Sequence, residues 1–317
     1  MKAAQLIKAR TYKIVEVDTP IPKSDEVLIK VKACGICMSE MGSWIGQEGV
    51  EYPLNAGMTG HEPYGIIAGG ECDEFPPGAT VTAILSPAYS YAEYVIAKKD
   101  AVCCIPDSMK DEIILGEPLA CAVNAVKRSP IKPGNSAVII GAGYMGLLLL
   151  SVLKHSSFAP IAVLDIKDEN LELAKKAGAD IVVNTQDSVA MDNLKTLVGG
   201  EGFDVVYEAA GKQATLDLAT ELIKIKGTLM IYGYHSINLR TVNMERWNWK
   251  AINIVNAHER DLSEYADGMK RGIKLFEYKK NMPTYITHKF ALEDIEDGFK
   301  MLENHPKGYV KGLIVVA

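Results

Sequence analysis

Residues 136–146 read SAVIIGAGYMG. The first part of this stretch, residues 136–140, is a short apolar run that predicts a buried β-strand. The apolar residues 144–154 follow after a short turn and predict a helix. Glycines spaced G-x-G-x-x-G between a strand and a helix are typical of a turn that binds a dinucleotide. The stretch therefore predicts the first unit of a doubly wound, parallel-sheet domain.

The glycines and the residues between them have separate expected roles. We expect Gly141 to allow the tight turn, Gly143 to let the backbone approach a pyrophosphate, and Gly146 to let the helix pack closely on the strand. Tyr144 and Met145 lie where the predicted helix begins. Free backbone N–H groups and the positive end of the helix dipole would face the phosphates there.

An acidic residue follows at the distance that such a site requires. The next predicted strand, IAVLDI (residues 161–166), contains Asp165, 19 residues after Gly146. A carboxylate at this place accepts hydrogen bonds from the adenosine ribose hydroxyls and would repel a 2′-phosphate. Asp165 therefore favours NAD over NADP, although an aspartate that only caps the next helix would look the same in the sequence.

The pattern of elements predicts two domains of the α/β class. Strand-like and helix-like segments alternate in residues 161–166, 169–179, 181–184, 203–211, 213–224 and 227–234. Such alternation indicates βαβ units and a parallel sheet. Short β-prone runs fill the first third (residues 26–33, 65–70, 79–85 and 91–97), and a helix at 292–302 and a strand at 312–317 end the chain. We expect a dinucleotide-binding domain, residues 118–256, inserted into a β-rich domain made of residues 1–117 and 257–317.

Charge and composition exclude several classes of partner. The net charge is −6, with 48% hydrophobic and 23% charged residues, and no basic cluster. These values argue against nucleic acid or an anionic membrane as the main partner. The first ten residues lack the apolar core of a secretory signal, and the longest apolar run, residues 146–153, is too short to span a bilayer. We therefore expect a cytoplasmic protein.

The first third contains side chains that a soft metal ion prefers. Cys37, His61, Glu62 and Glu117 offer thiolate, imidazole and carboxylate groups, which zinc takes as ligands. Cys34-x-x-Cys37 by itself could be a redox pair, half of a structural site or neither. No second CxxC follows at zinc-finger spacing, which argues against a four-cysteine site. An isolated histidine such as His61 is more often structural, so these residues alone do not decide the question.

Five ordered motifs extend over nearly the whole chain: GICMSE (35–40), GHEPYG (60–65), GEPLACAVNAV (116–126), VIIGAGYMG (138–146) and LDI (164–166). In this order and at these separations they resemble the zinc-containing medium-chain alcohol dehydrogenases, closest to the polyol and sugar dehydrogenase branch. The resemblance implies a GroES-like β-rich catalytic domain joined to a Rossmann domain.

The resemblance also implies a set of metal ligands. Cys37 matches the first zinc ligand of the family, His61 the second and Glu117 the third. Glu62 matches an acid that lies beside the metal and ligates it in some relatives. Glu40 matches an acid that orients the imidazole of His61. Cys34 matches no ligand, so we expect it to be structural.

Two departures from the family pattern bear on the mechanism and on stability. Ser39 matches the hydroxyl that hydrogen-bonds the reacting alcohol, but Gly42 stands where many relatives carry the histidine that passes the proton to solvent. Relatives often carry a lobe of four cysteines that binds a structural zinc. Here residues 79–85 run almost directly into residues 86–95 without a cysteine, so we expect one catalytic zinc and no structural zinc.

The expected reaction is reversible oxidation of a secondary alcohol, polyol or sugar-like, with hydride transfer to NAD. Cys37, His61, Glu62 and Ser39 would form the catalytic group. The proton route and the exchange between Glu62 and Glu117 as zinc ligands are open at this stage, as are the exact substrate, its stereochemistry and the physiological direction.

Five further residues are candidate contacts for ligands. Trp44 matches a place near the substrate cleft, and His258, Glu259 and Arg260 match a segment where polyol dehydrogenases contact substrate hydroxyls. Lys311 matches a basic residue near the cofactor phosphates. The alternatives are core packing for Trp44, an ion-pair cluster between domains for residues 258–260, and a solvated surface position for Lys311.

Three other functions fit the same fold less well. A zinc-free NADPH reductase would lack the Cys/His/Glu set and the ribose acid. A regulatory protein that binds a nucleotide is favoured only by the missing histidine at Gly42. A zinc enzyme that acts on an amino alcohol such as threonine is not excluded. We expect a small-molecule substrate and a homodimer or homotetramer, since these assemblies are common in the family.

Overall fold

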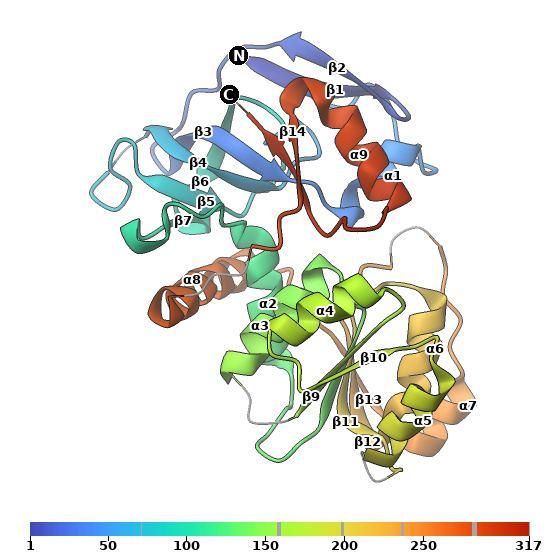
Figure 1. Cartoon of the computed structure of the whole chain (residues 1–317). Coiled ribbons are helices and arrows are strands. Elements are labelled where there is room, and N and C mark those ends of the chain that lie inside the picture. Colours follow the sequence, from blue (N-terminus) through green and yellow to red (C-terminus); the bar gives the residue numbers. More distant parts are fainter. Residues whose placement is uncertain (71, 157–159, 198–199, 236–237, 281–283, 317) are drawn as a thin grey trace. The chain divides into compact units, whose positions relative to one another are not determined.

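The computed structural model of the chain describes residues 1–70, 72–156, 160–197, 200–235, 238–280 and 284–316. The chain divides into two compact units, Met1–Cys121 with Glu259–Ala317, and Ala122–His258 (Figure 1). The predicted boundaries followed residues 117 and 256. The first division falls later, after Cys121, and both it and the predicted boundary lie inside the continuous helix α2 (Gly116–Arg128). None of the helices described is long and apolar enough to cross a membrane.

The first unit contains a mixed β-sheet that joins strands from the two ends of the chain, since β15 pairs with β3. The strands of this unit are β1 (Lys2–Lys8), β2 (Thr11–Glu16), β3 (Glu26–Gly35), β4 (Glu62–Gly69), β5 (Thr80–Ala83), β6 (Tyr94–Lys98), β7 (Val102–Cys104), β14 (His288–Ala291) and β15 (Gly312–Val315). The sheet has the order β14-β15-β3-β4-β5-β7, and β6 pairs with β3 outside this path. β1 and β2 form a separate antiparallel pair. The long strand β3 is buried at eight of its ten positions, as expected for the centre of a core.

Short helices complete this unit. They are α1 (Met41–Ile45), α2, α8 (Leu262–Lys279) and α9 (Ile295–Asn304), with 3-10 turns η1 (Met38–Glu40), η2 (Lys99–Ala101), η3 (Asp107–Met109) and η4 (Leu292–Asp294). The apolar side chains of α9 join those of the strands in one core. The predicted helix at 292–302 is therefore present but begins with a 3-10 turn. α8 was not predicted.

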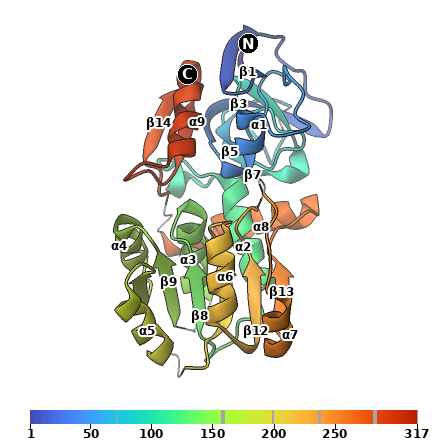
Figure 2. The same cartoon turned by 90° about the vertical axis from the view of Figure 1, so that its right-hand side faces the viewer.

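The second unit is a six-stranded parallel sheet flanked by helices (Figure 2). Its strands are β8 (Ala137–Ile140), β9 (Ile161–Asp165), β10 (Ile181–Asn184), β11 (Phe203–Glu208), β12 (Ile223–Ile231) and β13 (Asn253–Asn256). Its helices are α3 (Tyr144–Ser156), α4 (Asp168–Lys176), α5 (Ser188–Leu197), α6 (Gln213–Leu222) and α7 (Met244–Lys250). The strand order is β10-β9-β8-β11-β12-β13, with all neighbours parallel. The order reverses direction at β8, and ligands bind at such a switch point.

This unit confirms the predicted doubly wound domain and corrects one boundary. The helix predicted for residues 213–224 ends at Leu222, and β12 begins at once with Ile223. Ile223 is fully buried and pairs with Phe203 of β11. It therefore belongs to the strand and not to the helix. The strand predicted for residues 227–234 correspondingly begins earlier and ends at Ile231.

Candidate metal centre and dinucleotide site

The turn after β3 presents the thiol of Cys37. Residues 38–40 form the 3-10 turn η1, and Cys37 precedes it in an extended conformation. The backbone N–H of Cys37 donates to Glu40 Oε2 at 3.1 Å, which fixes the turn. The Ser39 hydroxyl donates to Cys37 Sγ at 3.2 Å. The residue predicted to hold the substrate hydroxyl therefore lies directly beside the predicted first ligand.

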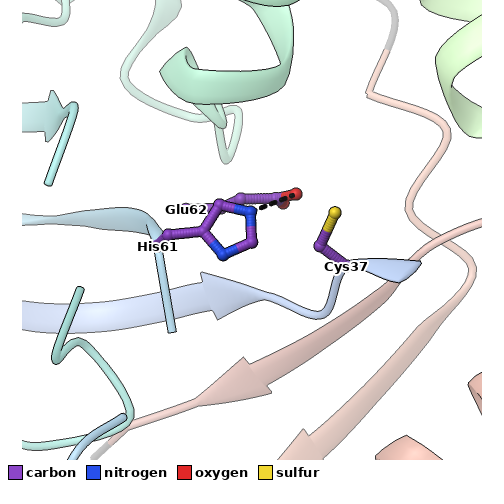
Figure 3. A group of neighbouring side chains, drawn as sticks. All are labelled: Cys37, His61 and Glu62. Atoms are coloured by element: carbon purple, nitrogen blue, oxygen red, sulfur yellow. Dashed lines mark ion pairs between the residues drawn. The ribbon is translucent and has the colours of Figure 1, made fainter. Parts of the chain in front are cut away.

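Strand pairing brings His61 and Glu62 to the same place. β4 runs antiparallel to β3, with Glu62 opposite Gly35. His61 directly precedes β4. It therefore lies near the end of β3, from which the chain continues to Cys37. One donor atom from each of Cys37, His61 and Glu62 lies within 4.8 Å of the others. Figure 3 shows the polar ends of these three side chains turned toward one another.

Glu40 orients the imidazole of His61. His61 Nδ1 lies 3.0 Å from Glu40 Oε1, and Tyr91 donates its hydroxyl to Glu40 Oε2 at 2.6 Å. Burial lowers the pKa of His61, but the hydrogen bonds and charges of Cys37 and Glu40 raise this pKa well above its ordinary value. The contact of Nδ1 with Glu40 leaves Nε2 for Glu62 or a metal ion, and Nε2 lies 4.0 Å from Glu62 Oε1.

The carboxylate of Glu62 is completely buried in a space that only glycine leaves open. A Cβ atom on Gly35 would lie 1.8 Å from Glu62 Oε2. The Glu62 carboxylate also forms an ion pair with Lys311, whose Nζ lies 2.6 Å from Oε2. Burial of a carboxylate requires such a partner, or a metal ion.

The position of Lys311 differs from the expectation. Lys311 was expected near the cofactor phosphates, or as a solvated lysine. It is 4% exposed, and its ammonium donates to Glu62 Oε1 at 2.8 Å and to the backbone carbonyl of Ile36 at 2.9 Å. A buried cation settles beside the buried carboxylate because neither is stable there alone. In this structure Lys311 belongs to the metal centre.

Glu117, the expected third ligand, lies outside the group formed by Cys37, His61 and Glu62. It is in the first turn of α2, and its Oε1 accepts a hydrogen bond from the hydroxyl of Tyr265 on α8. Burial raises the pKa of Glu117, the charge of His61 lowers it, and Glu62 raises it further, so the carboxyl still lies within electrostatic reach of the centre. The structure places Glu62 rather than Glu117 in the group.

The donor set fits a zinc ion. A thiolate, an imidazole and a carboxylate are ligands that zinc accepts, and three protein ligands leave a fourth tetrahedral position open for a reactant. The histidine already has the carboxylate partner that is usual behind a metal-bound imidazole. Cys37, His61 and Glu62 are therefore the residues that would hold the ion.

Two expected roles of nearby residues can be compared with the packing. Trp44 is fully buried, stacks on Phe299 at a centroid distance of 5.1 Å and donates its indole N–H to Glu303. Trp44 is thus core rather than a substrate contact, because its whole surface is already covered. Cys34 is fully buried and accepts a hydrogen bond from Ser90, and burial raises its pKa to about 12. A thiol of this kind is structural.

The glycine turn of the second unit has the geometry that a pyrophosphate requires. Gly141 has φ +107°, a conformation that favours glycine. A Cβ on Gly146 would lie 1.9 Å from the Gly141 carbonyl oxygen. The helix and the turn can therefore approach each other this closely only because residue 146 has no Cβ atom. A Cβ on Gly143 would meet nothing within 4 Å, which leaves its backbone open to a ligand. Tyr144 and Met145 begin α3 directly after it.

Asp165 ends β9 beside this turn. Its Oδ2 accepts the backbone N–H of Ala142 at 2.7 Å, and its Oδ1 accepts that of Lys167 at 2.9 Å. The carboxylate therefore ties the glycine turn to the end of the next strand. The adjacent Ile166 is 59% exposed, an apolar surface that could cover one face of a base. Ile166 was not among the predicted site residues, although its place directly after the acidic end of a strand was a signal.

The segment that contains His258, Glu259 and Arg260 connects the two units. Arg128 donates to the His258 carbonyl at 2.9 Å, and the imidazole packs edge-on against Tyr234. The carboxylate of Glu259 accepts the backbone N–H groups of Arg260 and Asp261. These contacts shape the segment itself, and the expected contacts of all three side chains with substrate stay predictions.

Comparison with known proteins identifies the class. Residues 23–107 match the model of the alcohol dehydrogenase GroES-like domain, and residues 145–271 match that of the zinc-binding dehydrogenases. The chain is 30% identical to the sorbitol dehydrogenase of Bacillus subtilis (strain 168) over 335 residues, 95% of this chain and 93% of that protein. The chain belongs to the zinc-containing medium-chain alcohol dehydrogenase family, in its polyol branch, and is an oxidoreductase of that family.

Two further similarities agree with this assignment. The D-xylulose reductase of Saccharomyces cerevisiae is 27% identical, with 98% of this chain and 96% of that protein covered. The crystal structure of galactitol-1-phosphate dehydrogenase from Escherichia coli superposes with a TM-score of 0.84 at 22% identity, over 99% of this chain and 100% of that chain. At that identity the second similarity shows the fold alone.

Proposed function

We propose that this protein is a zinc-dependent, NAD-linked dehydrogenase that interconverts a secondary alcohol of a polyol or sugar-like substrate and the corresponding ketone. The observation that carries the proposal is the group of Cys37, His61 and Glu62, with the hydroxyl of Ser39 at 3.2 Å from Cys37 Sγ. Similarity to a sorbitol dehydrogenase and a D-xylulose reductase supports a substrate with several hydroxyl groups.

The residues around this group would bind and orient the reacting hydroxyl. Zinc, when bound, lowers the pKa of a coordinated hydroxyl from about 16 towards about 7. Ser39 Oγ would accept the hydrogen bond of the substrate hydroxyl and, as it takes that proton, would pass its own hydroxyl proton on to a water molecule. Glu40, held by Tyr91, would keep the His61 ring fixed throughout, so that no reorganisation accompanies the reaction.

The proton would leave Ser39 through water. Gly42 has no imidazole, and a Cβ at Gly42 would lie 2.6 Å from the Oε1 of Gln47, so an amide occupies the adjoining space. An amide does not change its protonation state near neutral pH, whereas an imidazole does. Ordered water is the simplest carrier that remains.

Asp165 supports NAD as the cofactor. Its carboxylate lies at the end of β9 with Oδ2 2.7 Å from the N–H of Ala142 in the glycine turn. A 2′-phosphate on the ribose would bring a second negative charge against it, whereas two hydroxyls would donate to it. NAD would therefore bind more tightly than NADP.

A single assay tests this function. NADH formation is followed with a panel of polyols, simple secondary alcohols and threonine, with and without a zinc chelator, and with NADP in place of NAD. We expect activity with polyols and NAD that the chelator removes and added zinc restores. Full activity after the metal has been removed would overturn the proposal. Activity with threonine alone would show that the substrate is an amino alcohol and not a polyol.

We also propose that the protein forms a homo-oligomer through the edge of the parallel sheet. In the part of the chain that the structure describes, β13 pairs with β12 alone, and Ile254 on this strand is 48% exposed. Trp249 on the preceding helix is 69% exposed. An apolar strand edge in water favours pairing with another chain. Light scattering of the purified protein should give at least twice the mass of one chain, and Ile254→Lys should lower that mass.

A further inference from the structure

We propose that Tyr265 is a positioning residue that holds Glu117 away from the group of Cys37, His61 and Glu62, so that Glu62 is the carboxylate ligand of the metal and one coordination position stays open. The inference rests on the proposed zinc site. The observation behind it is the hydrogen bond from the Tyr265 hydroxyl to Glu117 Oε1, which joins α8 to the first turn of α2.

The sequence fixes Tyr265 in place through the start of α8. Asp261 caps this helix, and its Oδ1 accepts the backbone N–H of Ser263 at 2.9 Å and that of Glu264 at 3.1 Å. Tyr265 follows in the first turn, so its ring direction is set by the capped end of the helix. Tyr265 is half-buried, and burial is the first cause of its raised pKa.

The Tyr265 hydroxyl also contacts a second side chain of α2, that of Cys121. Cys121 lies one helical turn after Glu117, so both side chains are on one face of α2. The Cys121 Sγ lies 2.9 Å from the Tyr265 hydroxyl. A phenol has one proton to donate, and Glu117 takes it. The thiol of Cys121 thus contacts the phenol oxygen, and it also donates to Glu117 Oε1 at 3.7 Å, so Cys121, Tyr265 and Glu117 form one connected group. Burial raises the pKa of this thiol, which keeps its proton in place.

The two carboxylates of the centre thus have different partners. Glu62 is paired with a cation, Lys311, and lies within the donor group. Glu117 lies outside that group and accepts a hydrogen bond from a neutral hydroxyl, that of Tyr265. With Cys37, His61 and both carboxylates as ligands, a tetrahedral zinc site would carry a net negative charge and have no open position. Retention of Glu117 by Tyr265 preserves the three-ligand arrangement that catalysis needs.

The test uses visible absorption of the cobalt(II)-substituted protein, which reports the number and kind of ligands. Tyr265→Phe removes the hydroxyl and keeps the ring. We expect the spectrum to change towards higher coordination and the metal to be bound about tenfold more tightly in competition with a chelator, because Glu117 can then join the metal as a further carboxylate ligand. The matched control is Tyr52→Phe, which removes a hydroxyl bonded to the Ser43 carbonyl and should leave spectrum and affinity unchanged.

Two further variants make the result specific to Glu117. Glu117→Gln alone should leave the cobalt spectrum as in the wild type, since Glu117 is not a ligand there. The double variant Tyr265→Phe with Glu117→Gln should return to the wild-type spectrum. A spectrum that changes in Glu117→Gln alone, or one that Tyr265→Phe leaves unaltered, would overturn the inference. If the inference fails but the wild-type protein binds cobalt and oxidises polyols, the proposed function still holds. If the wild-type protein binds no metal, both the inference and the proposed function are wrong.

Discussion

The glycine turn of the second unit and the metal centre of the first are built in opposite ways. The turn is a continuous stretch of chain, and backbone conformation determines its shape: a positive φ at Gly141 and a missing Cβ at Gly146. The metal centre assembles side chains from η1 and the preceding Cys37, from β4 and the preceding His61, and from the segment before β15, and buried charges determine its shape. The turn therefore depends on which atoms are absent, whereas the centre depends on which charges are balanced.

This comparison predicts that zinc binding can be lost without loss of NAD binding, and the reverse. Cys37→Ser, or His61→Ala, should remove bound zinc and lower the rate by about a thousandfold or more, since the metal supplies several kcal/mol of transition-state stabilisation. NAD affinity, measured by calorimetry, should stay within about twofold because the glycine turn is unchanged. A parallel loss of NAD binding in these variants would show that the sites are not independent.

The reverse experiment changes the turn. Gly146→Ala places a methyl group 1.9 Å from the Gly141 carbonyl, which should cost about 1–3 kcal/mol of unfolding free energy and abolish tight NAD binding. Gly143→Ala is the matched control for packing, because nothing lies within 4 Å of its Cβ. It should keep the wild-type unfolding free energy and weaken only NAD. Denaturant titration measures the unfolding free energy of both variants, and zinc analysis checks that the metal centre is intact. Equal unfolding free energies of the two variants would contradict the packing argument.

A third change tests whether charge balance shapes the metal centre. Glu40→Gln keeps the shape of the side chain but removes the charge beside His61 Nδ1. Loss of such a partner typically weakens metal binding about 10–100-fold. Competition with a chromophoric chelator measures this. If the affinity for zinc is unchanged, Glu40 does not orient the ligand.

The smallest expected effect concerns cofactor choice. Asp165→Ala removes the acceptor for the ribose hydroxyls and should weaken NAD binding about tenfold, the size of one charge-assisted hydrogen bond. NADP affinity should rise relative to NAD because the repulsion is gone. Fluorescence titration with NADH and NADPH measures both. If the ratio of the two affinities is the same in wild type and variant, Asp165 does not select the cofactor.

Sequence predicted the turn more completely than the centre, for the same physical reason. Consecutive residues determine a backbone turn, so the spacing of Gly141, Gly143 and Gly146 was sufficient. The α/β class with a GroES-like and a Rossmann domain followed from periodicity and resemblance, and is confirmed.

The centre depends on side chains that pairing and packing bring together, and there the sequence was less informative. Resemblance placed Glu117 among the ligands, but no local pattern showed that α8 would present Tyr265 to it. The signal that was available is Asp261 before an amphipathic stretch, which predicts a capped helix. Lys311 was expected near the cofactor phosphates, and its pairing with Glu62 was not foreseen because the two residues are 249 positions apart.

The most direct test of the account is the zinc content of the purified protein and of its Cys37→Ser variant, measured by mass spectrometry of the metal. The account predicts one zinc per chain in the wild type and none in the variant, because Cys37, His61 and Glu62 are the group that could hold a metal ion among the residues that the structure describes. Two zinc ions per chain, or a variant that keeps its zinc, would contradict it.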